Sequence, residues 1–250
     1  MKRIVEGCML AAACLAGCSS QDQASEADYD DVAQALTAVV STGSGGGEVG
    51  AMSDSVSIAL GAGDLAIQAS TAGQWKSSHL GLEYDYAIRC KDAAGAQQDR
   101  CDKSTNSAGV EVKWSGDLGL PRLTASVTRD GSWQLTDLQS DTAHLNGDSD
   151  FELEAKVASL FRDVTRSYHV GYSAKYADVA LELAARRITG GKATYSIDAE
   201  RKATGPRRES EAQFSMDGEL TFGTDGSAML TLDRTFKYQI DTASGVMVKQ

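Results

Sequence analysis

Apolar and polar residues alternate over most of the chain from Leu82 onward. Apolar residues occupy every second position in a series of short segments: 82–90, 110–114, 123–127, 133–135, 151–157, 168–176, 193–199, 212–222 and 230–240. This period of two is typical of β-strands that bury one face and expose the other. The pattern predicts about ten to twelve strands.

The polar positions of these segments carry Glu, Asp, Lys and Arg, which indicates an antiparallel sheet with one face in water. Asp130-Gly131 and Asp225-Gly226 are typical of two-residue hairpin turns, so strands adjacent in sequence should pair. A meander of this length has to curl. We expect an all-β fold, mainly a long antiparallel meander that forms a strongly twisted sheet, a partly closed barrel or a sandwich.

Residues 178–189 fit the pattern less well than their neighbours. Their composition suits a helix by propensity. However, Val179, Leu181 and Leu183 alternate, and the Gly190-Gly191 pair leads directly into the next alternating segment. We therefore expect a strand here.

One amphipathic helix is predicted before the strands. Val32, Leu36 and Val39 recur at helical spacing. Aspartates crowd the start of this segment, where carboxylates complement the helix dipole and can cap free N–H groups. We expect the helix over residues 29–41, followed by a flexible, glycine-rich break over 42–50.

The N-terminus has the composition of an export signal. Lys2 and Arg3 precede an apolar run over residues 9–17, which is too short to cross a bilayer as a helix. The run ends in Leu15-Ala16-Gly17-Cys18. This motif resembles the lipobox of bacterial lipoproteins, which are processed by the lipoprotein signal peptidase.

The resemblance implies a lipid anchor. Residues 1–17 would be the signal peptide, removed before Cys18, and the sulfur of Cys18 would carry diacylglycerol. Residues 18–27 are polar and would form a flexible tether. In Gram-negative lipoproteins an Asp after the cysteine directs the protein to the inner membrane. Ser19 stands there in this chain, which favours attachment to the outer membrane of the cell envelope.

Composition supports a single β-rich domain over residues 28–250. The chain has 42% hydrophobic residues, enough for one sizeable core, and 25 glycines against two prolines, which suits strands and tight turns. The whole chain carries a net charge of −11 and residues 1–17 carry +1, so the processed chain carries −12. Nucleic acid is excluded as a partner because such a surface repels phosphate. A local basic cluster is interpreted as a solvated strand end or loop: Arg201, Lys202, Arg207 and Arg208.

Cys90 and Cys101 remain after processing and lie between two predicted strands. In an oxidising envelope we expect them to form a disulfide bond. A redox or metal role is disfavoured because the spacing is not C-x-x-C and no histidine is nearby.

No catalytic, metal-binding or cofactor signature is found. The three histidines, His79, His144 and His169, are too far apart in sequence to form a ligand pair on one element, and His169 lies on a polar strand face. The G-x-G-x-x-G match at residues 45–50 does not follow a strand. Residues 146–152 have oxygen ligands at alternate positions but lack the glycine and terminal glutamate of a calcium loop.

These observations favour a non-catalytic envelope lipoprotein that binds an envelope protein or an apolar ligand, or has a structural role. The alternative is an envelope hydrolase whose catalytic residues are dispersed over the strands, because the spacing of paired carboxylates exists only in the fold. An apolar face could line a ligand site or be ordinary core: Tyr84, Tyr86, Trp114, Tyr168 and Tyr172.

Overall fold

The fold is known from a computed structural model. It describes residues 23–42, 47–61, 67–71, 73–79, 81–120, 123–158, 165–205 and 208–250. The predicted signal peptide, Cys18 and the tether up to residue 22 lie outside the described residues.

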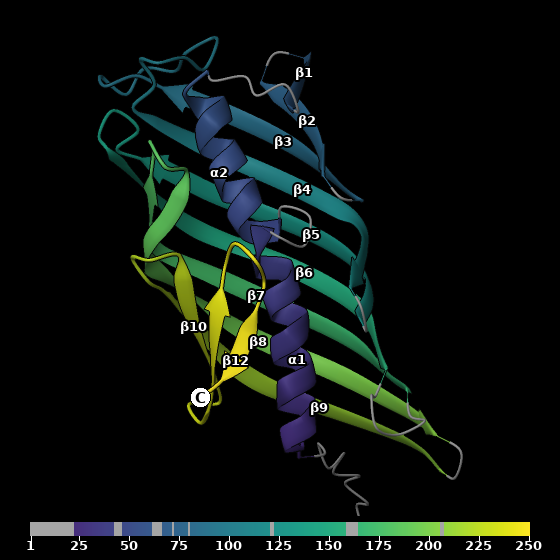
Figure 1. Ribbon diagram of the computed structural model, residues 1–250. Helices are drawn as coiled ribbons and strands as arrows, with labels where there is room; N and C mark the ends of the chain where they lie inside the picture. The colour runs from purple at the N-terminus through teal and green to yellow at the C-terminus, as the bar shows by residue number, and fades with distance from the viewer. Residues whose placement is uncertain are drawn as a thin grey trace, which may run out of the picture.

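Within the described residues, twelve strands form one antiparallel sheet in which every neighbour in space is a neighbour in sequence (Figure 1). The strands are β1 (Ile67–Thr71), β2 (Gln74–His79), β3 (Leu82–Lys91), β4 (Ser107–Leu120), β5 (Leu123–Thr136), β6 (Thr142–Ala158), β7 (Thr165–Glu182), β8 (Arg187–Gly205), β9 (Arg208–Phe222), β10 (Ser227–Leu232), β11 (Phe236–Asp241) and β12 (Met247–Lys249). The sheet is strongly curved but not closed. The predicted all-β meander is therefore confirmed.

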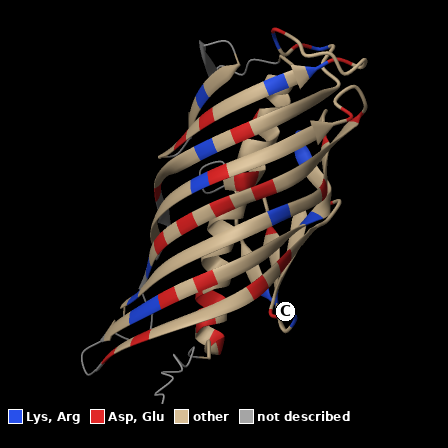
Figure 2. Ribbon diagram, turned by 180° about the vertical axis from the view of Figure 1, so that it is seen from behind, with Lys and Arg blue, Asp and Glu red and all other residues tan. Residues whose placement is uncertain are grey.

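In the part of the chain that the structure describes, two helices lie along the concave face of the sheet, α1 (Glu26–Val40) and α2 (Gly47–Ala59) (Figure 1). The alternating apolar residues of the strands face them and form one core with them. Neither described helix has the length and apolar character that crossing a bilayer requires. Figure 2 shows the molecule from behind, where Lys, Arg, Asp and Glu positions are spread over the strands of the sheet.

The apolar face that could have lined a ligand site is core. Tyr84, Tyr86, Trp114, Tyr168 and Tyr172 are each less than 5% exposed. The ring of Tyr84 packs against those of Tyr86 and Trp114. The ring of Tyr172 stacks on Phe151 with 4.4 Å between ring centres.

The helical part of the prediction needs two corrections. The first helix begins at Glu26, inside the predicted tether, because Asp28 accepts hydrogen bonds from the backbone and hydroxyl of Ser25 and so caps the first turn. The second helix, α2, was not predicted, and it includes residues 47–50 of the expected flexible break. It lacks a clear apolar stripe because it is buried on nearly all sides, with Ser55 and Ser57 bonded to carbonyls four residues back.

One of the two predicted hairpin turns is wrong. Asp225-Gly226 does join β9 to β10, but Asp130-Gly131 lies within β5, which runs without a break. Asp130 faces outward and pairs with Lys113 at 2.7 Å. Gly131 faces inward, where a Cβ would lie only 3.0 Å from Val112 and 3.3 Å from the indole of Trp133. Packing against these side chains, and not a turn, explains this glycine.

Residues 178–189 contain the ends of two strands. β7 continues to Glu182 and β8 begins at Arg187, with a turn between them. Val179 and Leu181 are buried as the alternation predicted, whereas Leu183 is only partly buried at the turn.

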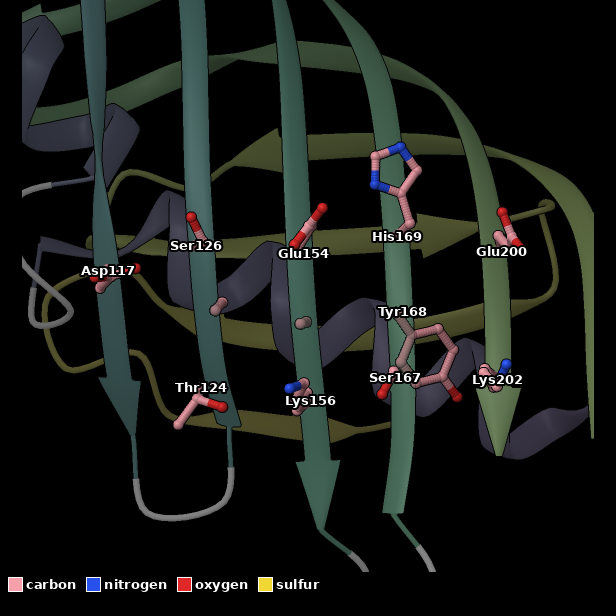
Figure 3. A pocket seen from close by; sticks show the side chains of 12 residues that line it. Asp117, Thr124, Ser126, Glu154, Lys156, Ser167, Tyr168, His169, Glu200 and Lys202 are labelled. Carbon is pink, nitrogen blue, oxygen red and sulfur yellow. The ribbon is translucent and has the colours of Figure 1, made fainter. Parts of the chain in front are cut away.

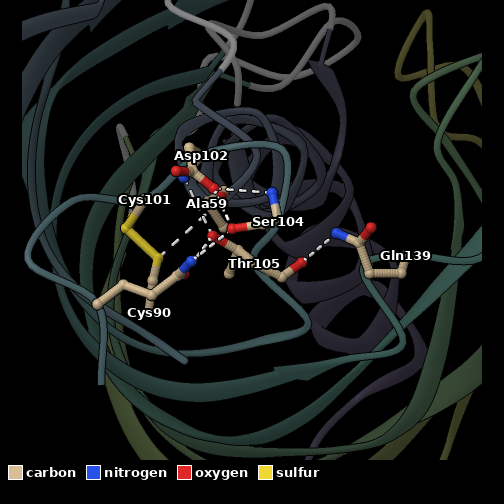
Figure 4. The surroundings of a disulfide bond; sticks show 8 residues. Ala59, Cys90, Cys101, Asp102, Ser104, Thr105 and Gln139 are labelled. Atoms are coloured by element: carbon tan, nitrogen blue, oxygen red, sulfur yellow. Dashed lines mark hydrogen bonds between the residues drawn. A yellow bond between two sulfur atoms is a disulfide. The ribbon is translucent and has the colours of Figure 1, made fainter. Parts of the chain in front are cut away.

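The predicted disulfide is present. Cys90 at the end of β3 is bonded to Cys101, with 5.4 Å between their Cα atoms (Figure 4). It anchors the loop that connects β3 to β4. The side-chain amide of Gln139 donates to the backbone oxygen of Thr105 in the same loop.

Candidate functional site

The core contains a fully buried ion pair between strand and helix. Arg129 lies on β5 at an inward-facing position, and its Nη1 is 2.7 Å from Oε1 of Glu48, in the first turn of α2. Both side chains are 0% exposed. Burial opposes the charge on Arg129, but the carboxylate of Glu48 and the neighbouring tyrosines outweigh it and raise the pKa of the guanidinium above its usual value. Arg129 is therefore a permanent cation in the core.

Hydroxyl groups from three other strands complete this cluster. Tyr172 and Tyr176 donate to Oε1 of Glu48 at 3.0 and 2.9 Å, and Tyr195 donates to Oε2 at 3.3 Å. Arg129 donates through Nη2 to Ser149 at 2.7 Å and to Tyr176 at 2.5 Å. Burial raises the pKa of each of the three tyrosines above 10, so all are neutral. The cluster joins α2 to β5, β6, β7 and β8.

A second polar cluster joins α1 to the sheet. Asp28 is 2.7 Å from Arg201, and Tyr168 donates to it at 3.1 Å. Asp31 accepts from Arg166 at 2.8 Å and from Tyr168 at 2.7 Å. The sequence predicted that Arg201 is solvated, and this is wrong for its side chain. Arg201 faces α1, where it pairs with Asp28. Lys202, by contrast, is on the outer face, paired with Glu211 at 2.7 Å.

The outer face has an open groove of about 670 Å³ over β4 to β8 (Figure 3). Two rows of side chains cross it. Glu154, His169 and Glu200 are cross-strand neighbours on β6, β7 and β8, and Lys156, Ser167 and Lys202 are neighbours in the same way two residues along. The side chains of Glu154, His169, Glu200 and Lys202 are exposed. His169 thus lies on the polar face, as predicted.

The groove contains residue types that hydrolases use, namely serine, histidine and glutamate. Among the described residues, no hydrogen bond links His169 to either groove serine, so no nucleophile is paired with a base. Glu154 and Glu200 stand on either side of β7, which puts their backbones about 10 Å apart. The groups are open to water, which active sites usually exclude.

The other candidates from the sequence form no site among the residues that the structure describes. His144 lies 2.6 Å from Asp178, and the side chain of His79 is outside the described residues. Residues 146–152 are part of β6, so Asp148 and its alternate neighbours point outward in a row and do not surround an ion. Within the described ranges, no group of three or more His, Cys, Asp or Glu side chains is placed to hold a metal ion.

The described residues of the G-x-G-x-x-G match at 45–50 do not form a phosphate-binding loop. Gly47 to Gly50 begin α2, and Glu48 faces Arg129. Residues 45 and 46 lie outside the described part of the chain.

Sequence reasoning missed Glu48 and Arg129. Arg129 is an even number of positions from Ala125, Val127 and Trp133 on the continuous strand β5. Its side chain therefore lies on the same, inward-facing side of the sheet as theirs. This alternation could have identified Arg129 as buried. It was overlooked because a turn was predicted at residue 130.

Comparison with known proteins gives no relative. No protein-family model, no curated protein sequence and no solved structure matches this chain.

Proposed function

We propose that this chain is a lipid-anchored envelope protein that binds a ligand in its outer groove and has no catalytic activity. The groove supports this most directly, because it gathers accessible charges of both signs on a broad sheet. Acyl chains on Cys18 would hold the domain at a membrane, because each buried CH₂ contributes about 0.8 kcal/mol. Ser19 after the cysteine favours the outer membrane.

The two rows define what the ligand should carry. Glu154 and Glu200 flank His169 and favour a cationic group, while Lys156 and Lys202 flank Ser167 and favour an anionic group. Successive same-face residues of a strand are about 7 Å apart. A ligand with an ammonium and a carboxylate or phosphate about 7 Å apart would meet both rows.

The hydrolase alternative has weaker support. The two carboxylate groups of a retaining glycosidase are about 5 Å apart and those of an inverting enzyme about 6.5–9.5 Å. Glu154 and Glu200 are about 10 Å apart at the backbone, and their flexible side chains leave the distance between the two carboxylates unfixed, so this pair gives the alternative no specific support.

The binding proposal is tested by charge removal. The lipidated chain and its Glu154→Gln/Glu200→Gln variant would be incubated with solubilised envelopes, cross-linked and compared by quantitative mass spectrometry. The control, Asp130→Asn/Asp150→Asn, removes the same charge from the same face outside the groove. We expect a component that wild type and control retain and the groove variant loses. Identical sets from all three proteins would refute the proposal.

The anchor is tested separately. A Cys18→Ser precursor should lose labelling by radioactive palmitate and appear in the soluble periplasmic fraction. Continued labelling of that variant would contradict the assignment of Cys18.

A further inference from the structure

The chain around the last strand, β12, carries two apolar side chains that are open to water. Val246 is 59% and Val248 55% exposed, and they are the only large hydrophobic side chains with such exposure in the described part of the chain. Both valines, together called the valine patch below, line a hollow of about 670 Å³. Side chains two positions apart in an extended segment lie on the same face. Neighbouring exposed apolar side chains indicate a surface that contacts a protein or a membrane.

The valine patch lies close to the point where the chain would leave for its lipid anchor. Nζ of Lys249, in β12, is 2.7 Å from Glu26 and 2.8 Å from Asp30, in the first turns of α1. Ser25, just before α1, lies seven positions after Cys18. Seven residues span at most about 25 Å when fully extended. The start of α1 and the strand tied to it by Lys249 therefore lie within reach of any membrane that holds Cys18.

The polar residues beside the patch suit a zwitterionic lipid headgroup. Val248 pairs with Gln239 of β11, so Lys237 and Asp241 lie on the same face as Gln239, one on either side of it. Both are exposed. The lysine can donate to a lipid phosphate, and the aspartate can accept from the ammonium group of ethanolamine. A strongly anionic surface is a poorer partner, because the processed chain carries −12.

The valine patch is too small to hold a free protein on a membrane, but it is large enough to orient a tethered one. Burying the exposed parts of two valines favours contact with lipid by about tenfold. A short flexible tether keeps the patch near the membrane at an effective concentration of roughly millimolar, so this modest preference is sufficient.

We propose that the valine patch docks on the zwitterionic lipid surface of the membrane to which Cys18 would be anchored. The inference rests on the proposed lipid anchor and adds to it a fixed orientation, with β12 and the start of α1 turned toward the lipid. The patch is separate from the outer groove, whose lining residues come from β4 to β8.

The cysteines of the chain allow this face to be labelled specifically. Cys18 would be acylated, and Cys90 and Cys101 form a disulfide bond, so a Val248→Cys variant offers one thiol for an environment-sensitive NBD fluorophore. The acylated variant would be reconstituted into phosphatidylcholine vesicles that contain nitroxide-labelled lipid. We expect the emission of this label to shift to shorter wavelength. The lipid should quench it several times more strongly than the same label in Ser115→Cys, at an exposed position of β4.

A second substitution tests the patch itself. Val246→Asp in the chain labelled at position 248 removes apolar area and adds a charge, so it should lower the docking equilibrium constant by about tenfold or more, measured as lost quenching. Thr194→Asp, at an exposed position of β8, adds the same charge elsewhere and should leave the quenching unchanged.

Flotation of the vesicles separates this inference from the anchor. Protein that floats with the vesicles while both labels stay equally in water refutes the docking and leaves the anchor intact. Protein that does not float refutes the anchor, and the docking with it. The label at position 248 would also be measured in the Cys18→Ser chain without vesicles. A shift there that grows with protein concentration would assign the patch to a second copy of the chain and refute the inference.

Discussion

At the residue scale, the buried pair of Glu48 and Arg129 has the largest energetic consequences. Taking two charges out of water is costly, and only their mutual attraction and the hydroxyl donors around them compensate. Removing one partner therefore leaves an unbalanced charge in the core, whereas removing both leaves no buried charge there.

Single and double substitutions should separate these effects. Arg129→Met and Glu48→Gln should each lower the free energy of unfolding by roughly 3–5 kcal/mol, and the double variant should lose less than the sum. Urea denaturation of the four proteins measures this. The exposed pair Lys113–Asp130 is the control, worth at most about 1 kcal/mol. Additive losses at Glu48 and Arg129 would contradict a coupled pair.

Asp28 should make stability depend on acid. Burial alone would raise its pKa, but hydrogen bonds from Ser25, the charge of Arg201 and the hydroxyl of Tyr168 outweigh burial and place the pKa below 3.8. A carboxylate with a lowered folded-state pKa stabilises the fold above its unfolded pKa, and this contribution is lost as the pH falls through the folded value.

The corresponding variant is Asp28→Asn. It should be less stable than wild type at pH 7, and the difference should shrink as the pH falls below about 3.8, measured by urea denaturation at each pH. Asp117→Asn, on the exposed outer face, should change stability by no more than about 0.5 kcal/mol. A constant difference between wild type and Asp28→Asn across this pH range would contradict the lowered pKa.

At the scale of elements, the strands were predictable because one face of the sheet meets the core and the other meets water. Tyr168 to Tyr176 on β7 show this alternation without interruption. The helix α2 was not predictable in this way, because it is enclosed by the sheet and needs no polar stripe. From the sequence alone, Glu48 would be expected on the surface. In the curved sheet, Tyr172 and Tyr195 surround its carboxylate and donate hydrogen bonds to it.

The hairpin of β7 and β8 depends on one glycine. Gly191 has a φ of +92°, and a Cβ there would lie 2.3 Å from the carbonyl oxygen of Asp178. Gly191→Ala should therefore cost roughly 2–3 kcal/mol. Gly171→Ala, in β7 with no atom within 4 Å of the added Cβ, is the control and should be close to neutral. Thermal unfolding of both variants tests this, and equal midpoints would contradict it.

At the scale of the whole molecule, charge has two distinct roles. Acidic side chains of the helices face inward to Tyr and Arg partners such as Tyr168, Arg129 and Arg201. The outer face carries mixed charges and a groove with rows of opposite sign. Because the processed chain would carry −12, its surface cannot hold it to anionic lipid, and the proposed anchor on Cys18 must do so.

The most direct test of the anchored account is the intact mass of the protein isolated from its native membrane with detergent. We predict the mass of residues 18–250 plus a diacylglycerol group and up to one further acyl chain, with fragment ions that place all of the added mass on Cys18. A mass equal to the unmodified chain, with or without residues 1–17, would contradict it.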